Sequence, residues 1–364
     1  MSTLLVTGGA GFIGANFVHY WNRHHPADKI VVLDALTYAG NRANLAGLPE
    51  VEFAHGDIRD TSLVEQLLGD LAIDTIVHFA AESHVDRSIH GPSVFVETNV
   101  NGTLSLLNAA RAVWLSGSGL PHRFHHVSTD EVYGTLGPND PAFSETTAYA
   151  PNSPYSASKA ASDHLVRAWH HTYGLQVTTS NCSNNYGPFQ FPEKLIPLFL
   201  INALHGRALP IYGDGMQIRD WLHVEDHCRG IEACLKRGRI GETYNIGGGA
   251  ELPNLKVIET LCAAVDAAFA ANPDLAARFP DAPPAKGQAT ASLKTFVTDR
   301  PGHDRRYAID ETKARAELGY APARTFEEGF AETLDWYLGN EGWWRAVMDG
   351  SYRDWCEANY LERA

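Results

Sequence analysis

A glycine-rich turn near the N-terminus, residues 8–14 (GGAGFIG), constrains the fold more than any other feature of this sequence. It follows a short apolar run typical of a β-strand and opens a segment with helical periodicity. A backbone that turns sharply against a pyrophosphate needs residues without side chains, and the free N–H groups of the following helix favour the anion. Asp34 ends the next strand-like run, where a carboxylate can accept hydrogen bonds from a ribose diol and repels a 2′-phosphate. The turn therefore predicts a dinucleotide site that prefers NAD to NADP.

Strand-like runs alternate with helical patterns through the first two thirds of the chain, which favours a parallel sheet covered by helices on both faces. We expect strands at 3–7, 29–34, 51–55, 75–80, 124–128, 175–180 and 243–246, and helices that start near Phe12, Thr61, Val94, Pro154 and Glu225. The predicted fold class is α/β, a Rossmann-type doubly wound parallel sheet with a smaller C-terminal substrate-binding lobe. We assign residues 1–180 to the NAD-binding domain, to which 213–249 return, and residues 181–212 and 250–364 to the lobe.

Composition excludes several classes of protein. The chain of 364 residues carries a formal net charge of −14, which disfavours binding to a nucleic-acid backbone. No apolar stretch approaches the roughly 18 residues that a membrane span needs, and the N-terminus does not resemble a signal peptide. The five cysteines include no CxxC pair, which favours reduced thiols and a cytoplasmic location.

Tyr155 and Lys159 lie at positions i and i+4 of a predicted helix and therefore share one face. A phenol with a pKa near 10 is a poor base at neutral pH. An ammonium about 4 Å away is worth about 4 kcal/mol at an effective dielectric constant near 20, or roughly three pKa units. We therefore expect Lys159 to lower the Tyr155 pKa, so that Tyr155 removes a proton from a substrate hydroxyl. Thr129, at the end of a predicted strand, can hold the same hydroxyl.

The phosphate turn, the strand-end Ser128-Thr129 pair and the YxxxK pair together resemble the extended short-chain dehydrogenases/reductases that act on nucleotide sugars. Within that group, STDEVYG at 128–134 is similar to the signature of the dTDP-glucose 4,6-dehydratase family. Further matching stretches are DALTYAGN at 34–41, AESHVDRS at 81–88, NNYGP at 184–188, FPEKLIP at 191–197, QIRDWLHVED at 217–226 and DRPGHDRRY at 299–307.

The resemblance implies NAD-dependent dehydration of dTDP-glucose to its 4-keto-6-deoxy product by a homodimer. In that reaction C4 is oxidised, water is lost between C5 and C6, and the retained NADH reduces C6. Loss of water needs both an acid and a base, and two neighbouring carboxyl groups easily keep one proton between them. By resemblance, Asp130 is the acid at the C6 oxygen and Glu131 is the base at C5.

The remaining site residues come from these motifs and from the resemblance. The predicted cofactor residues are Gly8, Gly11, Phe12, Ile13, Gly14, Asp34, Leu36, Thr37, Asp57, Ile58, Ala80, Ala81, Thr98, Tyr155, Lys159 and Asn185. The predicted substrate residues are Ser83, Thr129, Asn184, Glu193, Lys194, Leu195, Pro210, Ile211, Tyr212, Arg219, Asn254, Asp299, Arg300 and His303.

Three other interpretations compete with this one. A related nucleotide-sugar epimerase or decarboxylase would share the fold and the cofactor, although such relatives typically carry other residues at positions 130 and 131. A non-catalytic NAD sensor would need only the phosphate turn. The stretch HVEDH at 223–227 is neither HExxH nor HxxEH, so we predict no metal site.

Overall fold

The larger sheet confirms the predicted Rossmann-type architecture. The structure is a computed structural model that describes residues 2–119, 121–299 and 304–348. Seven strands, all parallel, lie in the order β10-β6-β5-β4-β1-β2-β3. Their bounds are β1 (Thr3–Thr7), β2 (Lys29–Asp34), β3 (Glu52–His55), β4 (Thr75–His78), β5 (Arg123–Thr129), β6 (Val177–Cys182) and β10 (Thr243–Ile246). The order reverses between β1 and β4, and in such sheets ligands bind beyond the carboxyl ends of the strands at that point.

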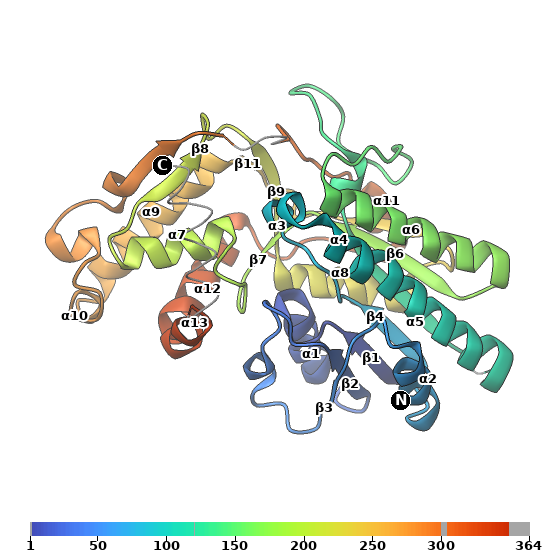
Figure 1. Ribbon diagram of the computed structural model, residues 1–364. Coiled ribbons are helices and arrows are strands. Elements are labelled where there is room, and N and C mark those ends of the chain that lie inside the picture. Colours follow the sequence, from blue (N-terminus) through green and yellow to red (C-terminus); the bar gives the residue numbers. More distant parts are fainter. Residues whose placement is uncertain (1, 120, 300–303, 349–364) are drawn as a thin grey trace.

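Helices cover both faces of this sheet (Figure 1). On one face α1 (Phe12–His24) and α8 (Val224–Arg237) pack on Leu4, Val6 and Val32. The other face carries α2 (Thr61–Asp70), α5 (Thr103–Ala110) and α6 (Pro154–Tyr173). The helix expected near Val94 begins at Pro92 as α4 (Pro92–Phe95), and it continues through two π-helical segments, Val96–Gly102 and Arg111–Ser118, on either side of α5. The short α3 (Val85–His90) precedes it.

Helix α6 positions the predicted Tyr–Lys pair. Ser153 caps it, because the Ser153 hydroxyl accepts a hydrogen bond from the Ser156 N–H, and Pro154 occupies its first turn. Gly174 ends it with φ of 80°. Because α6 starts beside the carboxyl end of β5, its first two turns lie where the sheet can bind a ligand.

The smaller lobe contains two sheets that the sequence analysis did not predict. Strands β7 (Asn184–Tyr186), β9 (Ile218–His223) and β11 (Glu251–Pro253) form one sheet, in the order β11-β9-β7. Strands β8 (Leu209–Tyr212) and β12 (Lys294–Val297) form the other. Most of these strands are three or four residues long, too short for a periodic pattern to be recognisable in the sequence.

The strand pairing differs in detail from the predicted division of the chain. Residues 213–223 were assigned to the larger domain, but β9 pairs with β7 and β11, and the chain returns to the larger sheet only with α8 and β10. Helix α11 (Thr312–Leu318), assigned to the lobe, packs on α8 and β10. Both differences arise because pairing partners distant in sequence decide which core an element joins.

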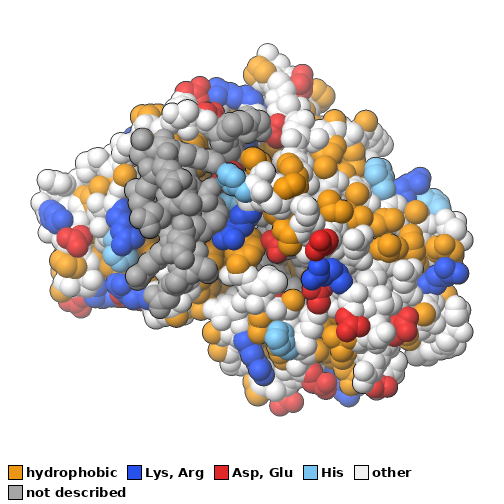
Figure 2. Space-filling model, in the orientation of Figure 1, with side chains coloured by type: hydrophobic (Ala, Val, Ile, Leu, Met, Phe, Trp, Pro, Cys, Tyr) orange, Lys and Arg blue, Asp and Glu red, His pale blue; other side chains and the backbone are white. Residues whose placement is uncertain are grey.

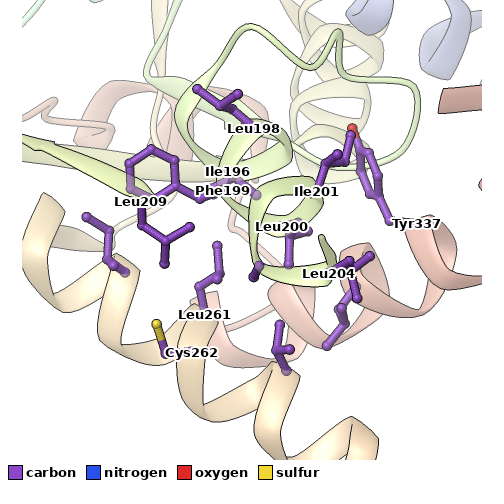
Figure 3. Packing of buried hydrophobic residues seen from close by; sticks show 14 of the residues in the cluster. Ile196, Leu198, Phe199, Leu200, Ile201, Leu204, Leu209, Leu261, Cys262 and Tyr337 are labelled. Carbon is purple, nitrogen blue, oxygen red and sulfur yellow. The ribbon is translucent and has the colours of Figure 1, made fainter. Parts of the chain in front are cut away.

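An apolar core holds the lobe together (Figure 3). Helix α7 (Leu195–Leu204) lies in its centre and is buried on nearly all sides, with α9 (Asn254–Ala271) and α12 (Phe326–Gly339) packed around it. Helix α13 (Glu341–Val347) adds Trp344, which is buried. The segment 272–292 is not irregular throughout, since it contains α10 (Asp274–Arg278) and two 3-10 turns, Pro283–Lys286 and Thr290–Leu293. Within the described residues, no helix is both long and apolar enough to cross a membrane.

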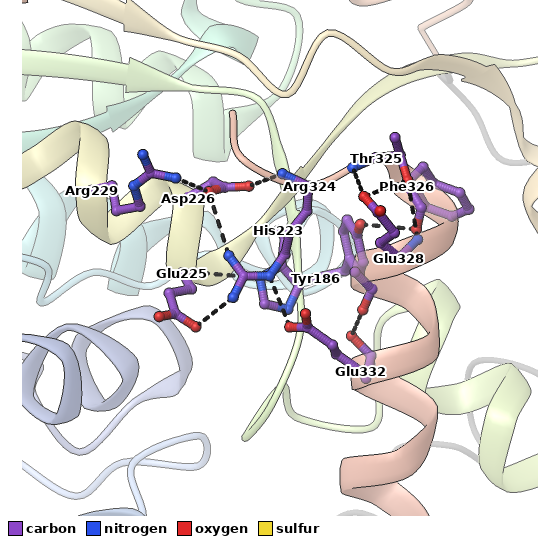
Figure 4. A network of polar contacts seen from close by, with 12 residues as sticks. Tyr186, His223, Glu225, Asp226, Arg229, Arg324, Thr325, Phe326, Glu328 and Glu332 are labelled. Carbon is purple, nitrogen blue, oxygen red and sulfur yellow. Dashed lines mark hydrogen bonds and ion pairs between the residues drawn. The ribbon is translucent and has the colours of Figure 1, made fainter. Parts of the chain in front are cut away.

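Arg324 connects the two parts of the molecule (Figure 4). It lies between α8 and α12 and donates hydrogen bonds to Glu225 at 3.0 Å and to Glu332 at 2.8 Å. Its guanidinium is also 3.6 Å from the carboxylate of Asp226, which is buried. A guanidinium that serves three carboxylates from two helices fixes α12 against the larger domain.

We expect Arg324→Leu to lower the free energy of unfolding by about 1–3 kcal/mol, because Glu225 and Glu332 lose charge-assisted hydrogen bonds and the buried Asp226 carboxylate loses a neighbouring positive charge. Chemical denaturation followed by circular dichroism measures the change. Arg315→Leu is the matched control, since it removes an exposed i,i+4 ion pair with Glu311 worth roughly 0.3–0.5 kcal/mol. If both variants lose the same free energy of unfolding, Arg324 contributes no more to stability than an exposed ion pair does.

Candidate active site

The glycine turn leaves space for a ligand against the ends of β1 and β4. Gly8 has φ of 70°, and a Cβ there would lie 2.6 Å from the Ala80 nitrogen. A Cβ on Gly14 would lie 2.2 Å from the Gly8 carbonyl oxygen. The turn opens into a cavity of about 380 Å³ that extends past β2 to the start of α6. Such a turn at the start of α1 can hold a pyrophosphate.

Asp34 stands at the end of β2 and lines this cavity. Its carboxylate accepts hydrogen bonds from the Ala10 N–H at 2.9 Å and from the Leu36 N–H at 2.8 Å. Burial raises the Asp34 pKa above its ordinary value, and these two donors oppose that effect. The carboxylate is therefore held rigidly beside the glycine turn, as recognition of a ribose requires.

All but one of the predicted cofactor residues line this first cavity. The structure brings together Gly8, Gly11, Phe12, Ile13, Gly14, Asp34, Thr37, Asp57, Ile58, Ala80, Ala81, Thr98, Tyr155, Lys159 and Asn185. Leu36 is not among the lining residues; its backbone instead supports Asp34. The roles of these residues stay predictions.

A 3-10 turn, Asp130–Tyr133, presents the two predicted acids. Thr129 ends β5 and caps the turn, since its hydroxyl accepts a hydrogen bond from the Glu131 N–H at 3.3 Å. Asp130 is only 1% exposed, and its Oδ2 has no hydrogen-bond partner among the described residues. Burial, reinforced by the neighbouring Glu131 carboxylate, raises the Asp130 pKa well above its usual range. Of the two acids, Asp130 is therefore the one that holds a proton more readily.

Tyr155 and Lys159 complete the predicted catalytic set, and both line the first cavity with Thr129, Asp130 and Glu131. The Lys159 ammonium donates a hydrogen bond to the Val127 carbonyl at 2.8 Å. In the chain by itself Lys159 does not bring the Tyr155 pKa below its ordinary value, because burial and the Glu131 charge raise that pKa well above it. The sequence argument counted the ammonium but not the hydration that a buried phenolate loses.

A second cavity of about 200 Å³ adjoins the first and is lined mainly by the smaller lobe. Glu131, Asn184, Asn185, Gln190, Glu193 and Lys194 line both cavities. Of the predicted substrate residues, Leu195, Pro210, Ile211, Tyr212, Arg219 and Asn254 line the second cavity, and Ser83 and Thr129 line the first. Asp299 lines neither and accepts a hydrogen bond from the Gln217 side chain at 2.7 Å. Arg300 and His303 lie outside the described residues.

Arg219 and Lys194 bring positive charge to the second cavity. The Arg219 guanidinium donates to the Ile218 and Asp304 carbonyls and stacks on the Tyr307 ring, 4.4 Å from its centroid. The carboxamide oxygens of Asn184 and Asn254 are buried and have no hydrogen-bond partner in the described part of the chain. Cations beside such polar atoms suit a phosphorylated, hydroxylated ligand.

Sequence reasoning did not single out several residues of the second cavity. Tyr307, Trp221 and Phe199 line it. Tyr307 lies in the DRPGHDRRY stretch, so the motif contained a signal, although no charge or spacing marked the aromatic ring as part of a site. Trp221 likewise lies in the QIRDWLHVED stretch, whereas Phe199 lies outside the matching stretches.

The histidines of the HVEDH stretch have structural contacts. His223 caps α8 by accepting the Glu225 N–H. His227 forms a 2.9 Å hydrogen bond with the Asn185 carboxamide oxygen, and burial lowers its pKa to about 3. In the described ranges no group of three His, Cys, Asp or Glu side chains could hold a metal ion.

The parallel sheet, the glycine turn and the Tyr–Lys pair that lines the first cavity define an extended short-chain dehydrogenase/reductase. The family model for GDP-mannose 4,6 dehydratase matches residues 5–333. The dTDP-glucose 4,6-dehydratase of Xanthomonas campestris pv. campestris (strain B100) is 56% identical over 362 residues, covering 97% of this chain and 98% of the relative. The chain belongs to the dTDP-glucose 4,6-dehydratase family.

Solved structures agree with this assignment. The dTDP-glucose 4,6-dehydratase DesIV from Streptomyces venezuelae, solved with NAD bound, superposes with a TM-score of 0.83 at 49% identity and covers 95% of this chain and 99% of its own. The UDP-glucose 4-epimerase of Thermus thermophilus, in complex with NAD, has a TM-score of 0.79 but only 28% identity, with 93% and 99% covered. The fold is thus shared with epimerases, while the sequence groups with the dehydratases.

Proposed function

We propose that this chain converts dTDP-glucose to dTDP-4-keto-6-deoxy-glucose with NAD as the retained cofactor. The observation that carries the proposal is the pair of acids on the 3-10 turn at the end of β5. Both line the cavity that contains Tyr155, and burial together with the Glu131 charge raises the Asp130 pKa. An acid and a base on neighbouring residues are what the loss of water from a 4-keto sugar requires.

The first cavity fits NAD because the glycine turn can take the pyrophosphate and Asp34 the ribose diol. Bound NAD would supply a hydride acceptor for C4 and a hydride donor for C6, and its cationic ring would lower the Tyr155 pKa. Tyr155 then takes the proton of the C4 hydroxyl, and the Thr129 hydroxyl orients that oxygen. Lys159 keeps a positive charge on the same face of α6.

Once C4 is a ketone, the C5 proton is acidic. Glu131 takes this proton, and the electron pair of the C5–H bond forms the C5=C6 double bond. Asp130 gives its proton to the C6 oxygen as the C6–O bond breaks, so that water leaves rather than hydroxide. The raised Asp130 pKa suits this role, because the acid must be neutral at the pH of the reaction.

The second cavity suits the nucleoside diphosphate part of the substrate. In a chain with a net charge of −14, an anionic ligand needs local cations, and Arg219 and Lys194 provide them. The buried carboxamide oxygens of Asn184 and Asn254 can accept hydrogen bonds from hydroxyl or N–H groups of such a ligand.

Mass spectrometry of dTDP-glucose and UDP-glucose, incubated separately with the purified enzyme and no added NAD, tests the proposal. We expect loss of one water from the thymidine sugar alone. An unchanged mass with an altered sugar would indicate an epimerase, and loss of carbon dioxide from an acidic sugar would indicate a decarboxylase. No reaction of any nucleotide sugar, even with NAD added, would favour an NAD sensor.

We expect Gly14→Ala to lower the amount of NAD that copurifies with the enzyme. The new Cβ would lie 2.2 Å from the Gly8 carbonyl oxygen, so the turn must shift away from its phosphate-binding shape. Strain of about 1–3 kcal/mol corresponds to roughly 5–150-fold weaker binding. The amount of copurified NAD is measured as the nicotinamide released when the protein is denatured. Gly69→Ala on α2, where a Cβ meets no atom within 4 Å, should leave that amount unchanged.

We also propose a homodimer and a cytoplasmic location. Ile89, Val94 and Val96 are 42–50% exposed on the helical segment from α3 through α4. Figure 2 shows hydrophobic side chains gathered on the same side of the molecule, over α4, α5 and α6. Sedimentation equilibrium should therefore give twice the chain mass, and Val96→Glu should shift the measured mass toward that of a single chain.

The four described cysteines carry free thiols, which supports a reducing compartment such as the cytoplasm.

A further inference from the structure

Next to Lys159 on α6 lies a buried polar cluster that the proposed reaction does not use. Asp163 occupies its centre, one turn beyond Lys159 on the same face of α6. Its carboxylate accepts hydrogen bonds from His126 at 3.0 Å, Ser128 at 2.8 Å and Tyr149 at 3.0 Å. The carboxylate is almost entirely buried, at 5% exposure.

The donors come from two different parts of the chain. His126 and Ser128 point from one face of β5 toward α6, and Tyr149 belongs to the loop that leads into that helix. The Tyr149 hydroxyl also accepts from Asn181 of β6 at 3.3 Å, which ties the cluster to the next strand. A carboxylate with three donors from separate elements is fixed in place, and its charge is not exposed to solvent.

The charge of this carboxylate bears directly on Lys159. Burial lowers the Lys159 pKa from its ordinary value, and Asp163 is the main group that opposes this effect. Burial raises the Asp163 pKa to about 6. The Lys159 charge and the hydrogen bonds from Ser128 and Tyr149 lower this pKa and so oppose the rise. At neutral pH Asp163 is therefore mostly ionised.

The other titratable groups around the pair do not replace that charge. On the strands, burial lowers the pKa of His126 and His78 well below the usual range, so both are neutral. Burial raises the Cys182 pKa to about 12, so this thiol of β6 is protonated. Tyr149 stays a neutral phenol because burial raises its pKa. His164, beside Asp163 on α6, lowers the Asp163 pKa by its positive charge and so does not replace the carboxylate.

We propose that Asp163 is a positioning residue that keeps Lys159 in its charged ammonium form next to Tyr155. It lines neither cavity and reaches the site through its neighbours Lys159 and Ser128. Because Lys159 supports the Tyr155 phenolate, Asp163 determines how far the active range extends toward alkaline pH. This inference deepens the proposed function and depends on it for its effect on the rate, but the ionisation of Lys159 can be measured without any substrate.

The experiment is a pH titration of Lys159 by NMR in full-length enzyme labelled with ¹³C at the lysine Cε, with the Lys159 signal assigned by its absence in Lys159→Met. We expect Asp163→Asn to move the Lys159 midpoint to lower pH by about 1–3 units, the usual effect of a neighbouring opposite charge. Asparagine is nearly isosteric, and His126 can change its tautomer to accept from the new amide. Tyr149→Phe is the matched control, since it removes a donor but keeps the charge, and its midpoint should equal that of the parent.

A second readout links the titration to catalysis. The rate of nicotinamide reduction in the first turnover with dTDP-glucose should decline as the pH is raised. In Asp163→Asn this alkaline decline should begin at a lower pH than in the parent, by the same shift as the NMR midpoint of Lys159. A Lys159 midpoint that does not move in Asp163→Asn overturns the inference, whether or not the enzyme turns over. Parent enzyme that shows no reduction at any pH contradicts the proposed function instead. If Asp163→Asn does not fold, Asp163→Ser, which leaves room for water, is titrated in its place.

Discussion

Replacing Tyr155 with phenylalanine is expected to lower the rate of C4 oxidation by about 10²–10⁴-fold, the usual effect of removing a general base. The Tyr155 phenol lines the first cavity beside Thr129, and a phenyl ring of nearly the same shape fills the same space. No later step can proceed without the ketone. The absorbance of reduced nicotinamide in the first turnover measures the effect directly.

The matched control for this variant lies on the same helix. Tyr173 is 39% exposed near the end of α6, and Tyr173→Phe should retain the parent rate and stability. Tyr155→Phe must also keep its bound NAD, so that the lost rate reflects proton transfer rather than a lost cofactor. Near-normal C4 oxidation in Tyr155→Phe would remove Tyr155 from the reaction and direct attention to Glu131 as the base for both steps.

Sequence patterns could predict the larger domain because its signals are local. The strands β1, β2 and β10 were predicted with the bounds they have, and the cap at Ser153 and the end at Gly174 follow from single residue types. Each of these features is decided within a few residues of the chain. The small sheets were not predictable in the same way, because β9 pairs with β7 and with β11, and the paired residues lie 31–37 positions apart in the sequence.

The candidate site shows the same limit. The motifs placed Thr129, Tyr155 and Lys159 together, since strand ends and helix starts meet at one edge of a parallel sheet. They could not show the protonation of these groups. The Tyr155 pKa depends on burial that no local pattern reveals, and Asp163 reads as an ordinary polar residue of α6 until its donors on β5 are seen. Burial and long-range hydrogen bonds therefore set the chemistry that the motifs only locate.

Glu131→Gln is expected to preserve C4 oxidation and to lower the rate of water loss by about 10²–10⁴-fold, because the amide cannot take the C5 proton. Reduced nicotinamide should then accumulate on the enzyme, since the hydride has no unsaturated C6 to return to. Glu65→Gln, at an exposed position of α2, is the control and should leave the reaction unchanged. A Glu131→Gln enzyme with full activity would exclude Glu131 as the base.

Comparison with Asp130→Asn separates the two roles. Both variants should slow the loss of water, but only Asp130→Asn retains a base at C5. In heavy water, Asp130→Asn should therefore exchange the C5 hydrogen of the bound 4-keto sugar for deuterium, while Glu131→Gln should not. Mass spectrometry of the recovered sugar measures the exchange. The opposite result would reverse the assignment, making Asp130 the base and Glu131 the acid, although burial, which raises the Asp130 pKa, argues for the order proposed here.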